Sequence, residues 1–212
     1  MKEPAHAAGA KKGRPLSFDR EAALHKAMLL FWRHGYEATS LSDLTAAMGV
    51  TAPSIYTAFG DKKRLFLEAV DRYLSGPVTS GSIIEAAGTA EEAARGLLRA
   101  AALGFTSSDT PPGCLLASSA ISCSAEAADV QSGLAAIRRR IEAGLHDKIV
   151  QAMEAGELAA DADADAVAGH IMAVIQGMST LARDGAPRDK LMRVAATAML
   201  AWPKRPAPFN PS

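Results

Sequence analysis

The sequence lacks the features that mark most secreted, membrane-embedded and β-rich proteins. It contains two cysteines, Cys114 and Cys123, in 212 residues, which argues against a disulfide scaffold as the basis of the fold. No apolar run is long enough to span a bilayer, and the first residues lack the apolar stretch of a secretory signal. Alternating runs of β-branched residues are missing as well. These absences make a cytoplasmic protein with no membrane partner the simplest expectation.

Catalytic and metal-binding motifs are also missing. The sequence has no G-x-S-x-G, no phosphate-binding P-loop and no H-E-x-x-H zinc motif. Cys114, Cys123, His146 and His170 match no common metal-ligand spacing. The two cysteines have apolar or small neighbours, among which a free cysteine behaves as a small hydrophobic residue. We therefore expect no enzymatic activity, no metal site and no cofactor.

The residues that are abundant indicate a helical protein with an uneven charge distribution. Hydrophobic residues make up 49% of the chain, and many are Ala, Leu and Met, which favour helices. The formal net charge is zero, but residues 1–64 carry ten Lys and Arg against six Asp and Glu. Residues 65–212 carry 13 against 17. Because phosphate affinity depends on local charge, this asymmetry fits a basic nucleic-acid-binding head on an acidic body.

The most informative segment is residues 40–59, which holds two short amphipathic helical patterns. Their apolar residues recur at three- and four-residue spacing and can cover one core, and they are Leu41, Leu44, Met48, Ile55 and Phe59. Gly49 supplies the positive φ that ends a helix, and Thr51 can cap the next one. Two helices joined by so tight a turn form the helix-turn-helix that places its second helix in a DNA major groove. The segment therefore predicts DNA binding.

The remaining sequence predicts an all-α chain of about nine helices in two parts. We expect a basic tail at 1–16, a DNA-binding domain at 17–76 with three helices through the helix-turn-helix, a helical ligand-binding and dimerisation domain at 77–203, and a tail at 204–212. Ser17 is the expected N-cap of the first helix. Gly-, Ser- and Pro-rich residues 75–88 mark the junction, within which Ile83, Ile84 and Ala87 can start a short helix. Thr89 and Glu92 form a capping box. Further helices are expected at 114–122, 126–156 and 188–202.

Residues 31–73 resemble the DNA-binding domain of TetR-type transcriptional regulators. The matching residues are Gly35-Tyr36, Thr39, Leu44, Ala47, Gly49-Val50, Ile55-Tyr56, Phe59, Lys62, Leu65 and Phe66. The match is gapless and fixes many positions, whereas the rest of the chain matches by helix count and layout. The resemblance implies a homodimer whose C-terminal helical body binds a small molecule. Ala58 departs from the family, which often has a large polar or aromatic residue there, so no DNA contact is carried over to it.

Small and hydroxyl-bearing residues dominate the expected DNA-contacting surface. The candidates are Thr39, Ser40, Thr51, Ala52, Pro53, Ser54, Tyr56, Thr57 and Lys62. The second helix has no Arg, Asn or Gln for bidentate base contacts, so direct sequence readout is expected to be thin. Lys62 and Lys63 begin the following helix, where cations oppose the dipole, and phosphate contact is one reason for this placement. Arg14 could enter a minor groove, although a basic tail that adds non-specific affinity is the favoured interpretation.

The apolar faces of the C-terminal helices supply candidates for a ligand pocket and a dimer interface. The expected pocket residues are Phe105, Leu115, Leu116, Ile149, Met153, Ile175 and Met178, and with few charges among them an apolar or weakly polar effector is expected. The expected dimer residues are Val167, Ile171, Val174, Leu181, Leu191, Val194 and Ala198. A helix-turn-helix usually needs two copies to read two half-sites, and a symmetric interface between two chains supplies the second.

Two other functional classes stay open at this point. An all-α enzyme would need convergent acid, base or nucleophilic groups, and the sequence offers none. A helical scaffold protein would leave the polar surface after Val50 without a purpose. We therefore favour a dimeric DNA-binding repressor that a small molecule releases from its operator.

Overall fold

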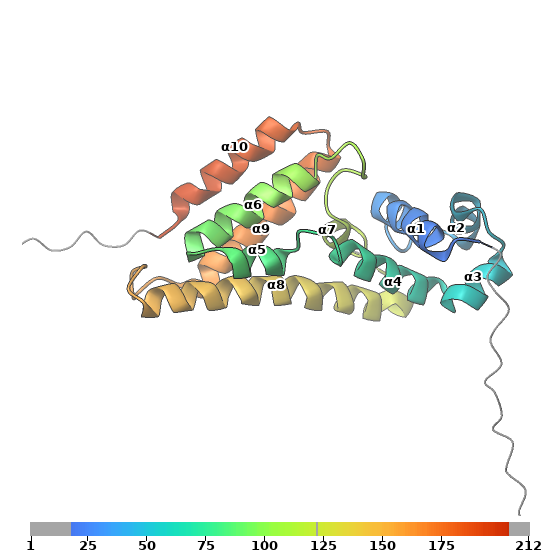
Figure 1. Cartoon of the computed structure of the whole chain (residues 1–212), viewed down its shortest axis with the longest axis horizontal. Coiled ribbons are helices and arrows are strands. Elements are labelled where there is room, and N and C mark those ends of the chain that lie inside the picture. The colour runs from blue at the N-terminus through green and yellow to red at the C-terminus, as the bar shows by residue number, and fades with distance from the viewer. Residues whose placement is uncertain (1–17, 122, 204–212) are drawn as a thin grey trace, which may run out of the picture.

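The computed structural model describes residues 18–121 and 123–203, and every regular element in these ranges is helical. The elements are α1 (Arg20–His34), α2 (Leu41–Met48), α3 (Ala52–Phe59), α4 (Lys62–Leu74), α5 (Ser80–Ala86), α6 (Ala90–Gly104), α7 (Leu115–Ser118), η1 (Ala125–Ala127), α8 (Ala128–Glu154), α9 (Ala164–Arg183), α10 (Arg188–Ala198) and η2 (Met199–Ala201) (Figure 1). The all-α prediction is confirmed. The tails predicted at 1–16 and 204–212, with Arg14, lie outside the described residues.

Short polar side chains start the helices, and those of Thr51 and Thr89 do so as the sequence predicted. Ser40, Thr51, Asp61 and Thr89 are the N-caps of α2, α3, α4 and α6, and each accepts a hydrogen bond from a backbone amide of the first turn. The capping box of Thr89 and Glu92 is present. The prediction of Ser17 as the cap of α1 is wrong, because Asp19 caps it by accepting from the amides of Glu21 and Ala22.

Three helix boundaries differ from the sequence prediction. Residues 80–86 of the expected junction form α5, because Thr79 and Ser82 build a further capping box. This helix brings the count to ten α-helices in the described residues, against the nine expected. Helix α7 ends at Ser118 and does not reach residue 122, and α10 gives way to a 3₁₀ turn after Ala198.

Helices α1–α4 form a head around an aromatic core. Phe31 of α1 and Phe66 of α4 are fully buried and meet edge to face, with ring centroids 5.1 Å apart. Leu44 of α2 and Ile55 of α3 are fully buried in the same cluster. Both helices of the helix-turn-helix are therefore fixed through one apolar face each, and α3 lies at one end of the molecule in Figure 1.

Helices α5–α10 form the body, and α8 runs along most of the molecule's length beneath it (Figure 1). Alanines of α6, including Ala93, Ala94 and Ala102, are fully buried and allow close packing against α9 and α10. Leu145 and Ile149 of α8 complete this core. Within the described ranges, no helix combines the length and apolarity needed to cross a membrane.

The core of the head extends into helices that follow it in sequence. Leu115 and Leu116 of α7 and Leu134 of α8 are buried in the same cluster as Phe31. The Glu37 carboxylate accepts hydrogen bonds from the amide and hydroxyl of Ser124, and these bonds lower the pKa of Glu37. The head is therefore packed directly on the first part of α8 and on α7, so movement of these helices reaches the head without a flexible linker.

Candidate nucleic-acid interface and body cavity

The turn between α2 and α3 has the geometry that its sequence predicted. Gly49 has φ 72° and ψ 33°, and its amide donates to the carbonyl oxygen of Thr45 over 3.0 Å. An added Cβ at Gly49 would meet no atom within 4 Å, so the left-handed backbone and not crowding favours glycine there. Thr51 then starts α3 by accepting from the amide of Ser54.

Helix α3 divides cleanly into a buried and an outward face. Ile55 and Phe59 point into the head core, with 0% and 4% exposure. The predicted contact residues lie on the other faces: Thr51, Pro53, Tyr56 and Thr57 are exposed, and Ala52 and Ser54 are half-buried. Tyr56 is the largest of them and is 53% exposed. The outward face is thus free of bulky charged groups and can approach a surface closely.

Thr39 and Ser40 occupy different environments at the start of α2. The Thr39 side chain is 1% exposed and its hydroxyl donates to the carbonyl oxygen of Gly35 over 2.7 Å. The Thr39 side chain is therefore engaged inside the head. Ser40 is exposed, and its hydroxyl donates to the Asp43 carboxylate over 2.6 Å within the capping box.

The two lysines that begin α4 have separate roles. The Lys62 ammonium lies 4.5 Å from the centroid of the Tyr36 ring and donates to the carbonyl oxygen of Glu37. Partial burial lowers the pKa of Lys62. Lys63 pairs with Asp129 of α8 and so ties the head to the body. Of the two, Lys62 is the one whose contacts stay within the head, with residues between α1 and α2.

A cavity of about 1010 Å³ lies between the head and the body. Trp32 of α1 and Tyr73 of α4 contribute walls from the head, and α5 to α9 contribute most of the rest, together with the loops before α5 and α7. Three of the predicted pocket residues line it: Phe105, Leu116 and Ile175. Because the walls come from both parts of the chain, an occupant of this cavity touches the helices that carry the DNA-binding elements.

Four of the predicted pocket residues lie elsewhere. Leu115, Ile149 and Met178 have 0% exposure and are packed in the cores, and Met153 packs against the body core without lining the cavity. Sequence reasoning also missed lining residues on α4, α6, α8 and α9, among them Tyr73, Leu97, Ile137, Arg138, Arg140, Ile141, Met172 and Gln176. Few of the lining residues are charged, as expected, and those that are charged are Arg138, Arg140 and Asp109.

Polar groups of the cavity wall are connected to the head. The Tyr73 hydroxyl donates to Sγ of Cys114 over 3.4 Å, and the Cys114 amide donates to the hydroxyl of Ser179 over 2.8 Å. Burial raises the pKa of the Cys114 thiol and, more strongly, that of the Tyr73 hydroxyl. The Trp32 indole donates to the carbonyl oxygen of Gly113 over 3.2 Å. Residues 113 and 114 thus join α1, α4 and α9.

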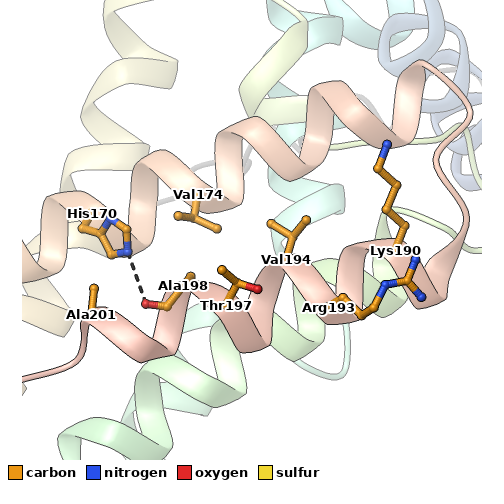
Figure 2. A pocket seen from close by; sticks show the side chains of 8 residues that line it. All are labelled: His170, Val174, Lys190, Arg193, Val194, Thr197, Ala198 and Ala201. Atoms are coloured by element: carbon orange, nitrogen blue, oxygen red, sulfur yellow. Dashed lines mark hydrogen bonds between the residues drawn. The ribbon is translucent and has the colours of Figure 1, made fainter.

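An open groove of about 560 Å³ runs between α9 and α10 (Figure 2). Its lining includes three predicted dimer residues, Val174, Val194 and Ala198, together with His170, whose Nε2 lies 3.4 Å from the Ala198 carbonyl oxygen. Val167 and Leu181 are half-buried on α9. Ile171 and Leu191, which were also predicted for the dimer interface, face the body core, with 1% and 0% exposure.

The cysteines and histidines are dispersed in the structure. Cys114 and Cys123 are both free thiols. Within residues 18–121 and 123–203, no group of three or more His, Cys, Asp or Glu side chains is placed to hold a metal ion. His146 contacts the neighbouring Asp147, and His170 lies at the α9–α10 groove.

Two family-level comparisons cover most of this architecture. Residues 23–69 match the family described as bacterial regulatory proteins, tetR family. Residues 91–198 match the family described as tetracyclin repressor-like, C-terminal domain. The first range contains the whole helix-turn-helix, and the second contains α9, α10 and most of the cavity walls.

Individual proteins are similar over nearly the whole chain. The HTH-type transcriptional repressor ComR of Escherichia coli is 38% identical over 195 residues, which cover 91% of this chain and 93% of ComR. An HTH-type transcriptional regulator of Bacillus subtilis, YezE, is 29% identical and covers 84% of this chain and 93% of YezE. A cysteine mutant of the TetR family regulator CifR, solved with a 26-base-pair operator DNA, superposes with a TM-score of 0.85 at 38% identity, over 90% of this chain and 100% of CifR.

Proposed function

The chain belongs to the TetR family of bacterial regulatory proteins and is a DNA-binding transcriptional regulator, and we propose that it is a homodimeric repressor released from its operator by a small molecule. It is not an enzyme, since the family consists of regulators. ComR is named as a repressor, and CifR was solved with operator DNA, which supports the same role here. We place its action in the cytoplasm, where bacterial DNA is found.

The proposed DNA-binding surface is the outward face of α3 with its flanks. It comprises Thr51, Ala52, Pro53, Ser54, Tyr56, Thr57, Ser40 and Lys62. Small side chains let the helix approach base edges, methyl groups of Thr and Ala suit thymine methyls, and hydroxyls and Lys62 suit phosphates. Residues 17–76 are the proposed DNA-binding domain, with the helix-turn-helix at 40–59, and residues 77–203 the ligand-binding and dimerisation domain.

The proposed dimer forms through α9 and α10. A two-fold interface between helix pairs uses the same surface on both chains, and the α9–α10 groove offers Val174, Val194 and Ala198 to it. The dimer presents two α3 helices to successive major grooves, about 34–36 Å apart. In the DNA-bound conformation of the dimer, the spacing of the two heads fits the operator. An effector releases the DNA only if it binds a conformation with a different head spacing more tightly than it binds the DNA-bound conformation.

The observation that carries this proposal is the composition of the cavity wall. Trp32 and Tyr73 belong to the head, yet they face the same cavity as Phe105 and Ile175 of the body. An occupant therefore has direct contact with α1 and α4, whose positions set the spacing of the two α3 helices. No separate relay between the ligand site and the head is needed.

A gel shift with the DNA that flanks the chain's own gene tests the function. We expect a discrete complex at nanomolar protein that survives excess random-sequence duplex, in the range of about 10⁻⁸ to 10⁻¹¹ M usual for specific complexes. Each duplex should carry an even number of chains. Binding that random duplex competes away equally well would refute specific regulation, and one chain per site would refute the dimer.

A further inference from the structure

Two of the three charged residues that line the cavity lie on one helix. Of the three charged lining residues, Arg138 and Arg140 lie on α8, and Asp109 lies in the loop before α7. The lining therefore carries a net charge of +1, on walls made mostly of apolar or small residues. A net positive charge beside apolar surface attracts an anionic occupant and repels a cationic one, and the partly buried position of Arg138 reduces the screening of its charge.

Helix geometry explains why these two arginines belong to the same site. Successive residues are about 100° apart on a helix, so Ile137 and Ile141 share one face, which lines the cavity. Arg138 and Arg140 flank that apolar stripe on its two sides, whereas Arg139, between them in sequence, points away and lines no part of the cavity. The apolar stems of the flanking arginines extend the stripe and bring their guanidinium groups to its edges.

Arg138 is anchored while part of its guanidinium stays available. Its Nη1 donates to the carbonyl oxygen of Leu116 over 2.6 Å, and the side chain is partly buried. A guanidinium has five N–H donors, so this bond leaves others for a ligand. The positive charge also acts on the Cys114 thiol, whose pKa it lowers against the larger effect of burial. Arg138 therefore lies on the side of the cavity formed by Cys114 and Leu116.

Arg140 lies at the opposite side of the stripe and is exposed. It also lines a neighbouring surface groove that contains Glu85 and Asp147. In the described part of the chain, neither Arg140 nor Arg138 has a carboxylate oxygen within the 4.0 Å of an ion pair. By contrast, Arg95, Arg72 and Arg193 are all paired with acidic residues.

From this arrangement we propose that the cavity binds a small carboxylic acid, with its apolar body over Ile137 and Ile141 and its carboxylate drawn to the guanidinium groups of Arg138 and Arg140 at the edges of this stripe. This inference rests on the proposed function, because it takes this cavity as the effector site. A guanidinium fork matches a carboxylate in geometry and charge. The volume of about 1010 Å³ is at the upper end of small-molecule sites, so a long or bulky apolar body fits.

Displacement of a neutral fluorescent reporter tests the proposal. N-phenyl-1-naphthylamine fills the apolar cavity, and decanoate and 1-decanol, which share a chain length, are compared as competitors at pH 7.5. We expect decanoate to displace the reporter at about ten-fold lower concentration than decanol, although decanol is the more hydrophobic compound. Isothermal titration of both compounds confirms the ranking without a reporter. Equal or tighter binding of decanol, or no binding of decanoate at millimolar concentration, would overturn the proposal.

Three neighbouring arginine variants locate the charge effect. In R140Q we expect the preference for decanoate to fall about ten-fold while decanol binding is unchanged, and R138Q should act in the same direction. R139Q removes the same charge from the outward face of the same helix and should keep the wild-type preference. Equal effects of R139Q and R140Q on the preference for decanoate would show that only the net charge of the protein matters, and this would overturn the assigned site.

Binding and DNA release are measured separately so that the two proposals fail differently. If decanoate binds through Arg140 but leaves the complex with operator DNA intact, the site assignment holds and release by this ligand fails. If only neutral compounds release the DNA, the proposed function holds and the carboxylate assignment fails.

Discussion

Arg183, near the end of α9, donates a hydrogen bond from Nη1 to the backbone carbonyl oxygen of Trp32 over 3.1 Å. Its Nη2 donates to the carbonyl oxygen of Arg33 over 3.0 Å. Both acceptors lie in the last turn of α1, where carbonyl groups lack helical partners and a cation is favoured by the dipole. Helix α9, which carries the proposed dimer surface, thus holds the end of the first head helix.

Replacing Arg183 should weaken this link between dimer surface and head. For R183Q we expect a loss of about 1–2 kcal/mol in the free energy of unfolding, because hydrogen bonds to a partly exposed charged group are lost. DNA affinity should fall as well, since the head is held less firmly. Urea unfolding and fluorescence anisotropy measure the two effects. R99Q, on the exposed face of α6, is the matched control, and equal behaviour of the two variants would contradict the role of Arg183.

Gly113 is expected to be irreplaceable, in contrast to Gly133. Gly113 has φ +83°, and an added Cβ would lie 2.8 Å from the Ser179 carbonyl oxygen and 2.9 Å from Cγ of Arg183. G113A should therefore cost at least about 2 kcal/mol. Gly133 lies within α8 with no atom within 4 Å of an added Cβ, so G133A should gain about 0.5–1 kcal/mol. Urea unfolding of both variants checks the opposite signs, and destabilisation by both would refute the argument.

The Cys114 thiol should react slowly with iodoacetamide at neutral pH. Burial raises the pKa of this thiol, so the reactive thiolate is scarce at neutral pH. The labelling rate should therefore keep rising at pH values above the pKa of an ordinary thiol, where the rate of an exposed cysteine levels off. Because the folded state holds the thiol proton more tightly than the unfolded state, the raised pKa adds to the free energy of unfolding at pH values below the ordinary thiol pKa. This contribution is lost as the pH rises through the raised pKa of the folded state. Mass spectrometry of a C123S background isolates Cys114.

A second variant tests the cause of this reactivity. The Tyr73 hydroxyl donates to Sγ of Cys114 and opposes the rise of its pKa, so Y73F should slow labelling further at every pH. Faster labelling in Y73F, or a rate that levels off near pH 8, would show that the thiol is not held as described.

A charge in the α9–α10 groove should separate the proposed dimer. Val174 lines this groove, and V174E would place a carboxylate in the interface. We expect a monomer by light scattering with unchanged helical content, and DNA affinity about 100-fold weaker because the two heads are no longer linked. L103E, at an exposed apolar position on α6, is the control for adding a glutamate. A V174E variant that stays dimeric would show that the dimer forms through a different surface.

Local sequence signals predicted much of the fold and of the helix-turn-helix. Gly49, Thr51 and Thr89 act through hydrogen bonds and backbone angles within a few residues, so their effects follow from short-range chemistry. Helix α5 was predicted less well, because its residues are Gly- and Ser-rich and its cap consists of common loop residues.

The cavity was predicted only in part, because apolar core and apolar lining have the same periodicity. Leu115 and Leu116 are equivalent in sequence, yet Leu115 is fully buried and Leu116 faces the cavity. Which of them lines it depends on how α7 is rotated against α8, and that is set by contacts distant in sequence. The same holds for Arg138, which no local signal in the sequence assigns to the cavity, because the packing of α8 places it beside Leu116.

The salt dependence of operator binding tests most directly whether α3 and its flank form the DNA-binding surface. Anisotropy titrations of a labelled operator duplex would compare wild type with Y56A, K62M and the control R139Q, at several salt concentrations. We expect Y56A to lose about ten-fold in affinity. K62M removes one phosphate contact from each chain of a dimer, so the slope of log affinity against log salt should flatten by about two, while R139Q leaves it unchanged. Wild-type affinity and slope in both Y56A and K62M would contradict the assignment.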